Sequence, residues 1–455
     1  MKDLRQLFGT DGIRGVANID LTPEFAVKVG RAGARYLADK SKKSSIIIGR
    51  DPRPSGDFIS SALISGILSS GIDVLDAGII TTPAVALITR LLGADGGIVI
   101  SASHNPINDN GIKFFAKGGH KLTDLQEKSI EDFILNSTAE SNGKKLSPSG
   151  SGPGRYKKLG NANEIYINYL SSNFKLDLSG LKIALDCANG AASILAPAAL
   201  EKFGAKVISF NNDTGGELIN KNCGSTHPDV ITGLILESRA DIGFTYDGDG
   251  DRVIAADNQG RILDGDIIIG FCAIDMLKKG LLKNNSVVTT VMANIGFDKV
   301  LNSKGIKIYK TNVGDRYVLE KMIEVDSILG GEQSGHIIFR NLSPTGDGII
   351  STLEFLNVVI NNNYDLEKIH DLIPKYPQVL KNVNVKDKSK ILSNENLKSI
   401  IKSFEDSLGN SGRILVRPSG TEPLIRVMVE AETVEKAEEI VSSISDEINN
   451  IDRAI

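Results

Sequence analysis

The stretch Ile98-Val-Ile-Ser-Ala-Ser-His-Asn-Pro106 is a short apolar run that leads directly into a polar loop. The same order recurs in Ile242-Gly-Phe-Thr-Tyr-Asp-Gly-Asp-Gly-Asp-Arg252 and in Ile328-Leu-Gly-Gly-Glu-Gln-Ser-Gly-His336. Short apolar runs bounded by turn residues are typical of buried strands. Ligands of open α/β sheets bind beyond the carboxyl ends of strands. Three such loops therefore indicate one shared ligand site in a cleft between domains.

Outward from these loops, β-branched runs alternate with amphipathic stretches, a pattern that predicts βαβ units and a largely parallel sheet. Thr22-Pro23 has the signature of a helix start. A further helix is expected at 57–69, and strands at 45–48, 72–75, 97–101, 181–186, 206–210, 241–246, 286–291, 307–311 and 327–329. A Pro/Gly/Ser-rich segment at 146–154 separates the first set from the second.

The chain of 455 residues is too long for one hydrophobic core. After about residue 370 the pattern changes to strands at 379–385 and around Val416 and Val427, a helix at 396–407, and a final helix from Val434. We expect three consecutive α/β domains with mixed, largely parallel sheets and a smaller C-terminal α+β domain, arranged around a central cleft. The expected bounds are 1–155, 156–256, 257–370 and 371–455.

The composition is that of a soluble globular protein, and the net charge of −4 argues against a basic surface for nucleic acid or anionic membrane. No apolar run approaches the ~20 residues that span a bilayer, and residues 1–9 contain no apolar segment typical of a secretory signal. Cys187, Cys223 and Cys272 are scattered, so we expect free thiols in a reducing cytoplasm.

Asp247, Asp249 and Asp251 alternate with glycines in what we call the acidic loop. Residues two apart project to one side of an extended chain, and like charges ~6 Å apart repel by about 0.7 kcal/mol per pair even in water. Mg²⁺, Mn²⁺ or Ca²⁺ would remove that repulsion. A calcium-binding EF-hand loop is excluded, because counting from Asp247 the sixth position is Arg252 instead of glycine and the twelfth is Asn258 instead of glutamate. A solvated acidic turn is the alternative.

The stretch Ser101-Ala-Ser-His-Asn-Pro106, here the serine loop, places a serine beside a histidine after a buried strand. The serine is either a nucleophile or phosphoryl carrier, or part of a turn, since serine and asparagine often hydrogen-bond nearby backbone. A Ser-His-Asp hydrolase is disfavoured, because the loop lacks a G-x-S-x-G elbow.

Arg417-Pro-Ser-Gly-Thr-Glu-Pro423 combines a guanidinium, two hydroxyls and a glycine, which are the groups of a phosphate-binding loop. Arg426 adds a second cationic donor, and a Pro/Gly turn between strands is the other interpretation. Phe8-Gly-Thr-Asp-Gly-Ile-Arg-Gly15 is a second candidate ligand loop. Neither stretch is a P-loop, since G-x-x-x-x-G-K-[ST] is missing.

Together these loops resemble the α-D-phosphohexomutase superfamily over essentially the whole chain. The serine loop, the acidic loop, the loop at 330–336 and the loop at 417–423 stand in that superfamily's order, one per domain. Within it, the chain is similar to the bacterial phosphoglucosamine mutases at 8–15, 111–115, 313–321, 345–348 and 416–430. One departure is Pro52, in a supporting loop where threonine is common.

The resemblance implies a role for each candidate residue. Ser103 would carry a phosphoryl group, and one Mg²⁺ per subunit would be held by Asp247, Asp249, Asp251 and the phosphorylated Ser103. Lys113, a candidate general acid/base, and Arg14 would act near the transferring group, in a cleft also lined by His104, Arg252 and His336. Sugar hydroxyls would contact Glu332 and Ser334. The non-reacting phosphate would contact Arg417, Ser419, Gly420 and Thr421, with Arg426 beside them.

The implied activity is interconversion of glucosamine 6-phosphate and glucosamine 1-phosphate through glucosamine 1,6-bisphosphate, the intermediate and activator, for UDP-N-acetylglucosamine and cell-wall precursor synthesis. We expect a phosphosugar as partner, neither nucleic acid nor membrane, and a homodimer is compatible with the sequence. A phosphoglucomutase or phosphomannomutase of the same fold is the alternative, and Gln333 favours glucosamine by resemblance alone. A silent phosphosugar-binding protein and a phosphatase that loses its phosphoserine to water are further alternatives.

Overall fold

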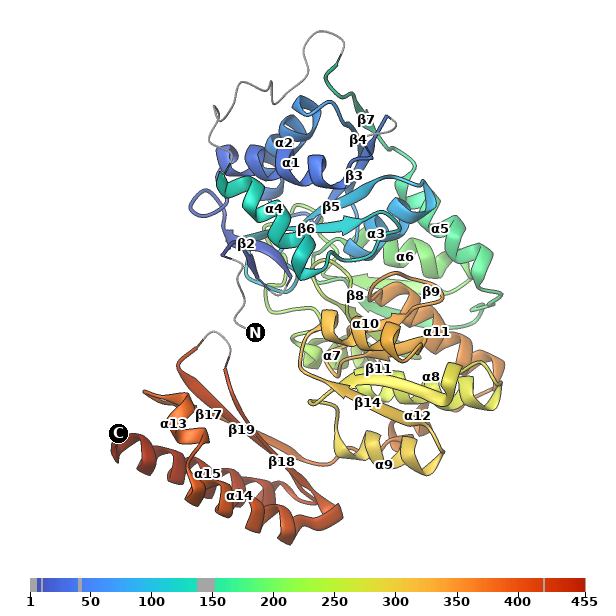
Figure 1. The fold of residues 1–455 in the computed structure, drawn as a ribbon. Coiled ribbons are helices and arrows are strands. Elements are labelled where there is room, and N and C mark those ends of the chain that lie inside the picture. The colour runs from blue at the N-terminus through green and yellow to red at the C-terminus, as the bar shows by residue number, and fades with distance from the viewer. Residues whose placement is uncertain (1–5, 10, 40–42, 137–151, 420–421, 455) are drawn as a thin grey trace. The chain divides into compact units, whose positions relative to one another are not determined.

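Three consecutive segments of the chain repeat one order of elements in the computed structural model, which describes residues 6–9, 11–39, 43–136, 152–419 and 422–454 (Figure 1). Each segment runs strand, helix, strand, helix, strand, and then a fourth strand that turns back. The first consists of β3 (Ser45–Arg50), α2 (Ser55–Ser69), β4 (Asp73–Ile79), α3 (Thr82–Leu91), β5 (Gly96–Ile100) and β6 (Asp109–Ala116). The second consists of β8 (Lys182–Asp186), α6 (Ala192–Lys202), β9 (Lys206–Phe210), α7 (Pro228–Ser238), β10 (Ile242–Tyr246) and β11 (Val253–Asp257). The third consists of β13 (Ser286–Thr290), α9 (Ile295–Ser303), β14 (Lys307–Thr311), α10 (Asp315–Glu324), β15 (Leu329–Gly331) and β16 (Ile337–Phe339).

The three sheets share one strand order, β6-β5-β3-β4, β11-β10-β8-β9 and β16-β15-β13-β14. The last three strands in each of these orders are parallel to one another. The first strand in each order, which is the fourth strand of its segment, pairs antiparallel with the third strand of that segment. The first sheet also contains β1 (Phe8–Gly9), β2 (Gly12–Val16) and β7 (Tyr156–Lys158), and the second contains β12 (Ile262–Leu263). The predicted mixed sheets are therefore confirmed, and each polar loop is the turn between two antiparallel neighbours.

Helices α1 (Pro23–Leu37), α4 (Asp124–Asn136), α5 (Ala162–Asn173), α8 (Gly265–Lys278), α11 (Gly348–Asn361) and α12 (Leu366–Leu372) complete this part of the chain. The predicted start at Thr22 is confirmed, because its side chain accepts a hydrogen bond from the backbone N–H of Phe25. Helices α1 and α2 approach closely through glycines. A Cβ on Gly30 would lie 2.4 Å from the carbonyl oxygen of Leu63, so a larger residue there would separate the helices.

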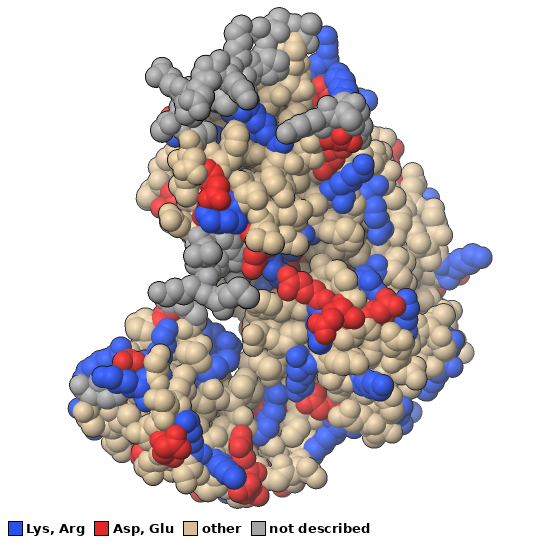
Figure 2. All heavy atoms as spheres, in the orientation of Figure 1, with Lys and Arg blue, Asp and Glu red and all other residues tan. Residues whose placement is uncertain are grey.

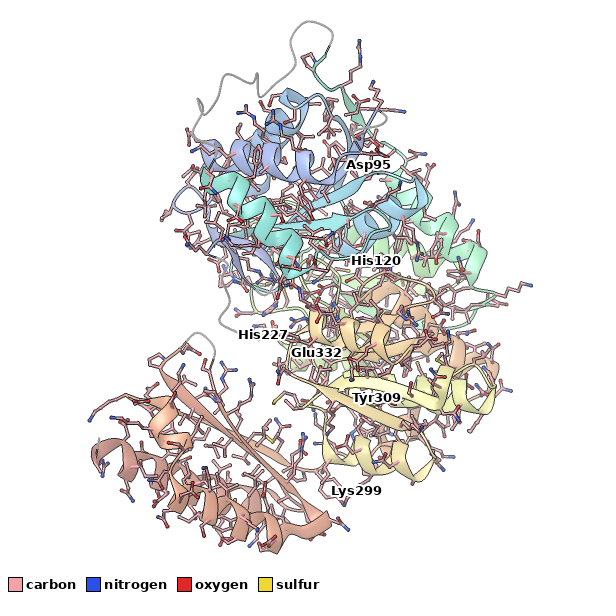
Figure 3. All side chains as sticks on the ribbon, in the orientation of Figure 1. Asp95, His120, His227, Lys299, Tyr309 and Glu332 are labelled. Atoms are coloured by element: carbon pink, nitrogen blue, oxygen red, sulfur yellow. The ribbon has the colours of Figure 1, made fainter. Side chains whose placement is uncertain are left out.

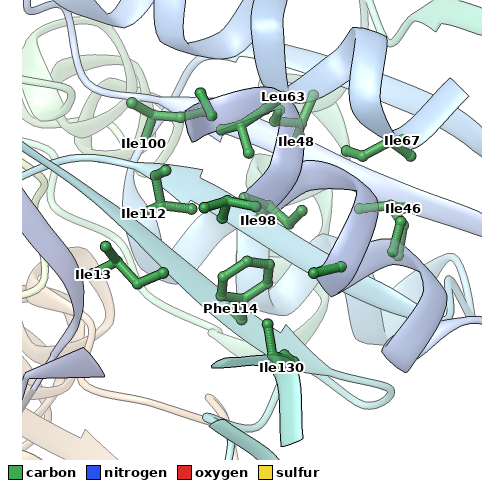
Figure 4. Close-up of a cluster of buried hydrophobic side chains, with 14 of the residues drawn as sticks. Ile13, Ile46, Ile48, Leu63, Ile67, Ile98, Ile100, Ile112, Phe114 and Ile130 are labelled. Atoms are coloured by element: carbon green, nitrogen blue, oxygen red, sulfur yellow. The ribbon is translucent and has the colours of Figure 1, made fainter. Parts of the chain in front are cut away.

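Strand β5, which leads into the serine loop, is buried at the centre of the first core (Figure 4). Ile98 and Ile100 on β5 belong to one cluster with Ile48, Ile112 and Phe114 from the neighbouring strands. Full burial of one such side chain stabilises a fold by about 1.5–3 kcal/mol. This packing fixes the strand end from which the serine loop begins.

The C-terminal domain is α+β, as predicted, with β17 (Gln378–Asn384), α13 (Lys388–Leu392), α14 (Glu395–Leu408), β18 (Arg413–Pro418), β19 (Leu424–Glu430) and α15 (Val434–Ala454). Its strands form an antiparallel sheet in the order β17-β19-β18. It makes a compact unit with residues 293–304, separate from the unit that holds the rest of the chain. Within it, Glu430 accepts the backbone N–H of Ile295, and Lys299 lies 4.4 Å from the ring centre of Tyr376 (Figure 3).

Charged residues of both signs are intermixed on the face seen in Figure 2. Within the described ranges, no helix is long and apolar enough to cross a membrane. The three cysteines are buried and unpaired, as the sequence predicts.

Candidate active site

Ser103 lies in the serine loop between β5 and β6, with only 3% of its surface exposed. Its Oγ donates a 2.6 Å hydrogen bond to Oδ2 of Asp247 and lies 3.3 Å from Nδ1 of His104. Its φ of +51° is in the left-handed region, which is uncommon for a residue with a side chain. The structure thus brings the serine loop and the acidic loop, which are far apart in sequence, into direct contact.

The three aspartates of the acidic loop form a buried cluster in which one oxygen from each lies within 4.8 Å of the others. Burial, with the charges of Asp251 and Asp249, raises the pKa of Asp247 well above its ordinary range. The Oδ1 atoms of Asp249 and Asp251 have no hydrogen-bond partner within the described part of the chain. Crowded carboxylates with free buried oxygens fit a hard divalent cation. These residues could therefore hold the predicted metal ion.

Lys113, on β6, is a buried ammonium beside this cluster. Its Nζ lies 2.8 Å from Oδ2 of Asp249 and 2.7 Å from Oδ2 of Asp11. Burial would lower the pKa of Lys113, but Asp11 and Asp249 raise it well above its ordinary value. Lys113 is therefore positively charged, in a state that can donate a proton.

Two further polar side chains, Asp11 and Thr82, contact this cluster, and the sequence analysis did not identify them. Asp11 accepts a 2.8 Å hydrogen bond from Nη2 of Arg14, so it joins Arg14 to Lys113. Thr82, at the start of α3, donates from Oγ1 to Oδ2 of Asp249 over 2.6 Å. Asp11 lies in the candidate ligand loop at 8–15, so the sequence did indicate a functional role for that loop. For Thr82, the only feature in the sequence that could have indicated a role is its position after a strand.

The loop between β15 and β16, residues 332–336, lies against the acidic loop. Arg252 and His336 pair as an isolated antiparallel bridge. The buried Nε2 of His336 lies 3.8 Å from Oδ2 of Asp251 and 3.6 Å from Oδ2 of Asp315. The structure therefore brings Arg252 and His336 together at the cluster.

The two predicted sugar-contact residues of this loop differ in exposure. Glu332 is buried and accepts a 3.0 Å hydrogen bond from the backbone N–H of Gly314 (Figure 3). Ser334, two residues on, is exposed. A loop with one anchored carboxylate and one exposed hydroxyl can offer both to a polyhydroxy ligand.

His104 follows Ser103 in the serine loop. Burial, together with the charges of Arg252 and Arg14, lowers the pKa of His104 to about 4. It is therefore a neutral imidazole near pH 7. His227 immediately precedes α7, and His120 follows β6 (Figure 3).

The predicted phosphate loop lies at the turn between β18 and β19, in the second compact unit. Arg417 and Arg426 are directly opposite each other on the two strands. Like charges in that position are destabilising, and burial and Arg426 together lower the pKa of Arg417. Nη2 of Arg426 lies 3.3 Å from Oε2 of Glu422, and a bound anion would compensate more of the positive charge. Nζ of Lys388, which the sequence analysis did not identify, donates to the carbonyl oxygen of Ser419 over 2.7 Å. Gly420 and Thr421 lie outside the described residues.

Four family descriptions match the chain in succession. They are the phosphoglucomutase/phosphomannomutase alpha/beta/alpha domain I at residues 5–141, domain II at 164–260 and domain III at 264–376, and the C-terminal domain at 380–447. The chain is also 47% identical to the phosphoglucosamine mutase of Desulforamulus reducens over 448 residues, which cover 98% of this chain and 100% of that one. It is 49% identical to the phosphoglucosamine mutase of Carboxydothermus hydrogenoformans, over 96% of this chain and 98% of that one.

Solved structures of low sequence identity share the fold. A phosphoglucomutase/phosphomannomutase family protein from Burkholderia thailandensis has a TM-score of 0.80 at 22% identity, over 98% of this chain and 97% of that one. The Aspergillus fumigatus N-acetylphosphoglucosamine mutase, in complex with GlcNAc-6P and magnesium, has a TM-score of 0.69 at 19% identity, over 98% and 96%. From the four matched domains and the near full-length relatives, the chain belongs to the phosphoglucomutase/phosphomannomutase family and, within it, groups with the phosphoglucosamine mutases.

Proposed function

We propose that this protein interconverts glucosamine 6-phosphate and glucosamine 1-phosphate, with Ser103 as the phosphoryl carrier. The observation that carries the proposal is the 2.6 Å hydrogen bond from Ser103 Oγ to Asp247, within a buried cluster of three carboxylates. The phosphoglucosamine mutases at 47–49% identity support the amino sugar as substrate. The domains at 1–155, 156–256, 257–370 and 371–455 would each contribute one loop.

The reaction has two phosphoryl transfers. In the first, the Oγ–P bond of phospho-Ser103 breaks as a bond forms between phosphorus and the free hydroxyl oxygen of the sugar monophosphate. The proton of that hydroxyl passes to Ser103 Oγ, and the product is glucosamine 1,6-bisphosphate. In the second, the bisphosphate has turned around, and its other phosphoryl group returns to Oγ as the proton returns to the sugar. We assign the proton transfer to Lys113, the buried ammonium beside the acidic loop, which would give its own proton to Oγ and take up the proton of the sugar hydroxyl.

The other residues position the substrate and balance its charge, because phosphoryl transfer is catalysed mainly by positioning and electrostatics. Mg²⁺ held by Asp247, Asp249, Asp251 and phosphorylated Ser103 would neutralise charge on the transferring group. Magnesium in the A. fumigatus complex supports that choice of ion. Arg14, His104, Arg252 and His336 would contact the transferring group, while Glu332 and Ser334 would bind sugar hydroxyls. Arg417, Ser419, Gly420, Thr421 and Arg426 would bind the other phosphate.

The function is tested by ³¹P NMR of the protein with Mg²⁺, a trace of the matching hexose bisphosphate, and each hexose 6-phosphate in turn. We expect the highest rate of 1-phosphate formation with glucosamine 6-phosphate. A higher rate with glucose or mannose 6-phosphate would identify the alternative mutases of the same fold. Release of inorganic phosphate without 1-phosphate would indicate a phosphatase, and no turnover of any substrate would indicate a binding protein.

Replacing Arg417 with alanine is expected to raise KM for glucosamine 6-phosphate by about 10- to 100-fold, since a hydrogen bond to a charged group contributes about 1.5–3 kcal/mol. The effect on kcat should be small, because an anchor on the non-reacting phosphate holds substrate and transition state alike. Steady-state kinetics measure both constants. Lys402→Ala, on the exposed face of α14, is the matched control. An unchanged KM in Arg417→Ala would exclude the anchoring role.

A further inference from the structure

The backbone carbonyl of Ser103 is held by two side chains from different parts of the chain. Nη2 of Arg53 donates to it over 3.0 Å, and Nδ2 of Asn220 donates to it over 2.8 Å. The same two groups also donate to the carbonyl oxygen of Asn105, over 2.7 and 3.2 Å. The turn that carries Ser103 is therefore held at two carbonyl groups that lie two residues apart.

Arg53 is fully buried, and its guanidinium is committed to this turn. Its Nε is 3.0 Å from Oδ2 of Asp51, and Nη1 donates to the carbonyl oxygen of Asp109 over 3.0 Å. Oδ2 of Asp51 accepts a 2.6 Å hydrogen bond from Ser101 Oγ, which in turn accepts the N–H of Ser103 over 2.9 Å. Both the N–H and the C=O of Ser103 are thus tied to the Asp51–Arg53 pair.

Asn220 reaches the turn from the segment between β9 and α7, in the second α/β segment. It is half-buried, and its φ is +57°. Gly248 of the acidic loop packs against the same contact. A Cβ at Gly248 would lie 2.6 Å from the Ser103 carbonyl oxygen and 2.7 Å from Asn220 Nδ2. The serine loop, the acidic loop and the Asn220 amide therefore meet without room for one more carbon atom.

We propose that Asn220 is a positioning residue for Ser103, whose left-handed backbone it holds together with Arg53 so that Oγ faces Asp247. This inference rests on the proposed function. A left-handed backbone is strained for a residue with a side chain and persists only where its surroundings enforce it. Of the two side chains that hold the Ser103 carbonyl, Asn220 is the one that comes from another domain. It therefore also sets the distance between the serine loop and the acidic loop.

Loss of the Asn220 amide should misalign phosphoserine with the sugar hydroxyl and expose it to water. In the competing reaction the oxygen of water attacks phosphorus, the Oγ–P bond breaks, one water proton ends on Oγ, and inorganic phosphate leaves. A displacement of about 1 Å at a reacting group can cost on the order of 100-fold in rate. The signature of misalignment is therefore slow transfer combined with hydrolysis.

The test compares Asn220→Gly with Asn222→Gly. Glycine accepts a positive φ without strain, so the first variant removes the amide and keeps the backbone. Asn222 also has a positive φ, of +52°, but it is exposed and makes no side-chain hydrogen bond within the described ranges. For Asn220→Gly we expect kcat to fall by about 10- to 100-fold, with KM unchanged. Inorganic phosphate released per sugar isomerised should rise by about 10-fold or more, since the slowed transfer no longer outpaces hydrolysis.

The ratio of hydrolysis to isomerisation does not depend on the fraction of folded enzyme, so a merely structural role would leave it unchanged. Asn220→Asp keeps the size of the side chain but removes the donor, and it should show the same raised ratio. If Asn220→Gly matches Asn222→Gly in ratio and kcat, the positioning role is wrong. If the wild-type protein forms no phosphoserine from glucosamine 1,6-bisphosphate and Mg²⁺, the proposed function itself fails.

Discussion

Ser103→Gly is expected to lower the rate of glucosamine phosphate interconversion by at least about 10⁴-fold, the scale on which enzymes lose activity when their nucleophile is removed. Without Oγ there is no atom to carry the phosphoryl group between the two sugar positions. Glycine suits the φ of +51° at this position, so the backbone of the serine loop can keep its conformation. The loss should therefore come from the chemistry alone. Interconversion is followed by ³¹P NMR.

Ser103→Ala is the companion variant, since alanine also lacks Oγ but is strained at a positive φ. Both variants should be inactive, and Ser103→Ala should be the less stable of the two in thermal unfolding. Intact-protein mass spectrometry after incubation with glucosamine 1,6-bisphosphate should detect a phosphorylated wild-type chain and neither variant phosphorylated. Near-normal turnover by Ser103→Gly would show that another group carries the phosphoryl.

Much of the fold could be predicted from the sequence, because its signals are local. The strand expected at 206–210 has the same bounds as β9, and the helix expected at 396–407 differs from α14 by one residue at each end. Apolar runs, helix caps and turn residues each act within a few positions of the chain. Strand β6, which pairs antiparallel with β5, was not predicted. The sequence of a strand does not indicate whether its neighbour in the sheet runs parallel or antiparallel to it.

The sequence predicted the chemical groups of each loop in the candidate site, but not which loops contact one another. The serine loop and the acidic loop could each be interpreted separately, but Ser103 and Asp247 are 144 positions apart, and only the fold brings them together. Asn220 had no signal of its own, since an asparagine with a positive φ is ordinary in turns. Its role depends on a carbonyl oxygen 117 positions away. Long-range partners of backbone groups leave no pattern in one sequence.

Asp251→Asn is expected to have opposite effects on stability and on activity. Asp251 is the suitable carboxylate to replace, because its Oδ1 has no hydrogen-bond partner among the described residues, whereas Asp249 is paired with Lys113. Burial and the charge of Asp249 raise the pKa of Asp251, so its negative charge destabilises the metal-free fold. The variant should unfold at a higher temperature than the wild-type protein in a chelating buffer. Its kcat with saturating Mg²⁺ should be lower by at least about 100-fold, the scale of loss when a group that stabilises transition-state charge is removed.

Added Mg²⁺ separates a metal site from a solvated acidic turn. A ligand at 100 times its dissociation constant stabilises a folded protein by about 2.7 kcal/mol, so the wild-type unfolding temperature should rise with Mg²⁺ and that of Asp251→Asn should stay nearly constant. Asp213→Asn, at an exposed position of the second α/β segment, should behave as the wild-type protein does. Equal rises in Asp251→Asn and Asp213→Asn would mean that Asp251 is not a metal ligand, and no rise in the wild-type protein would mean that the acidic loop holds no Mg²⁺. A metal site must also lose activity as the pH is lowered, because protons compete with the metal ion for the carboxylate oxygens.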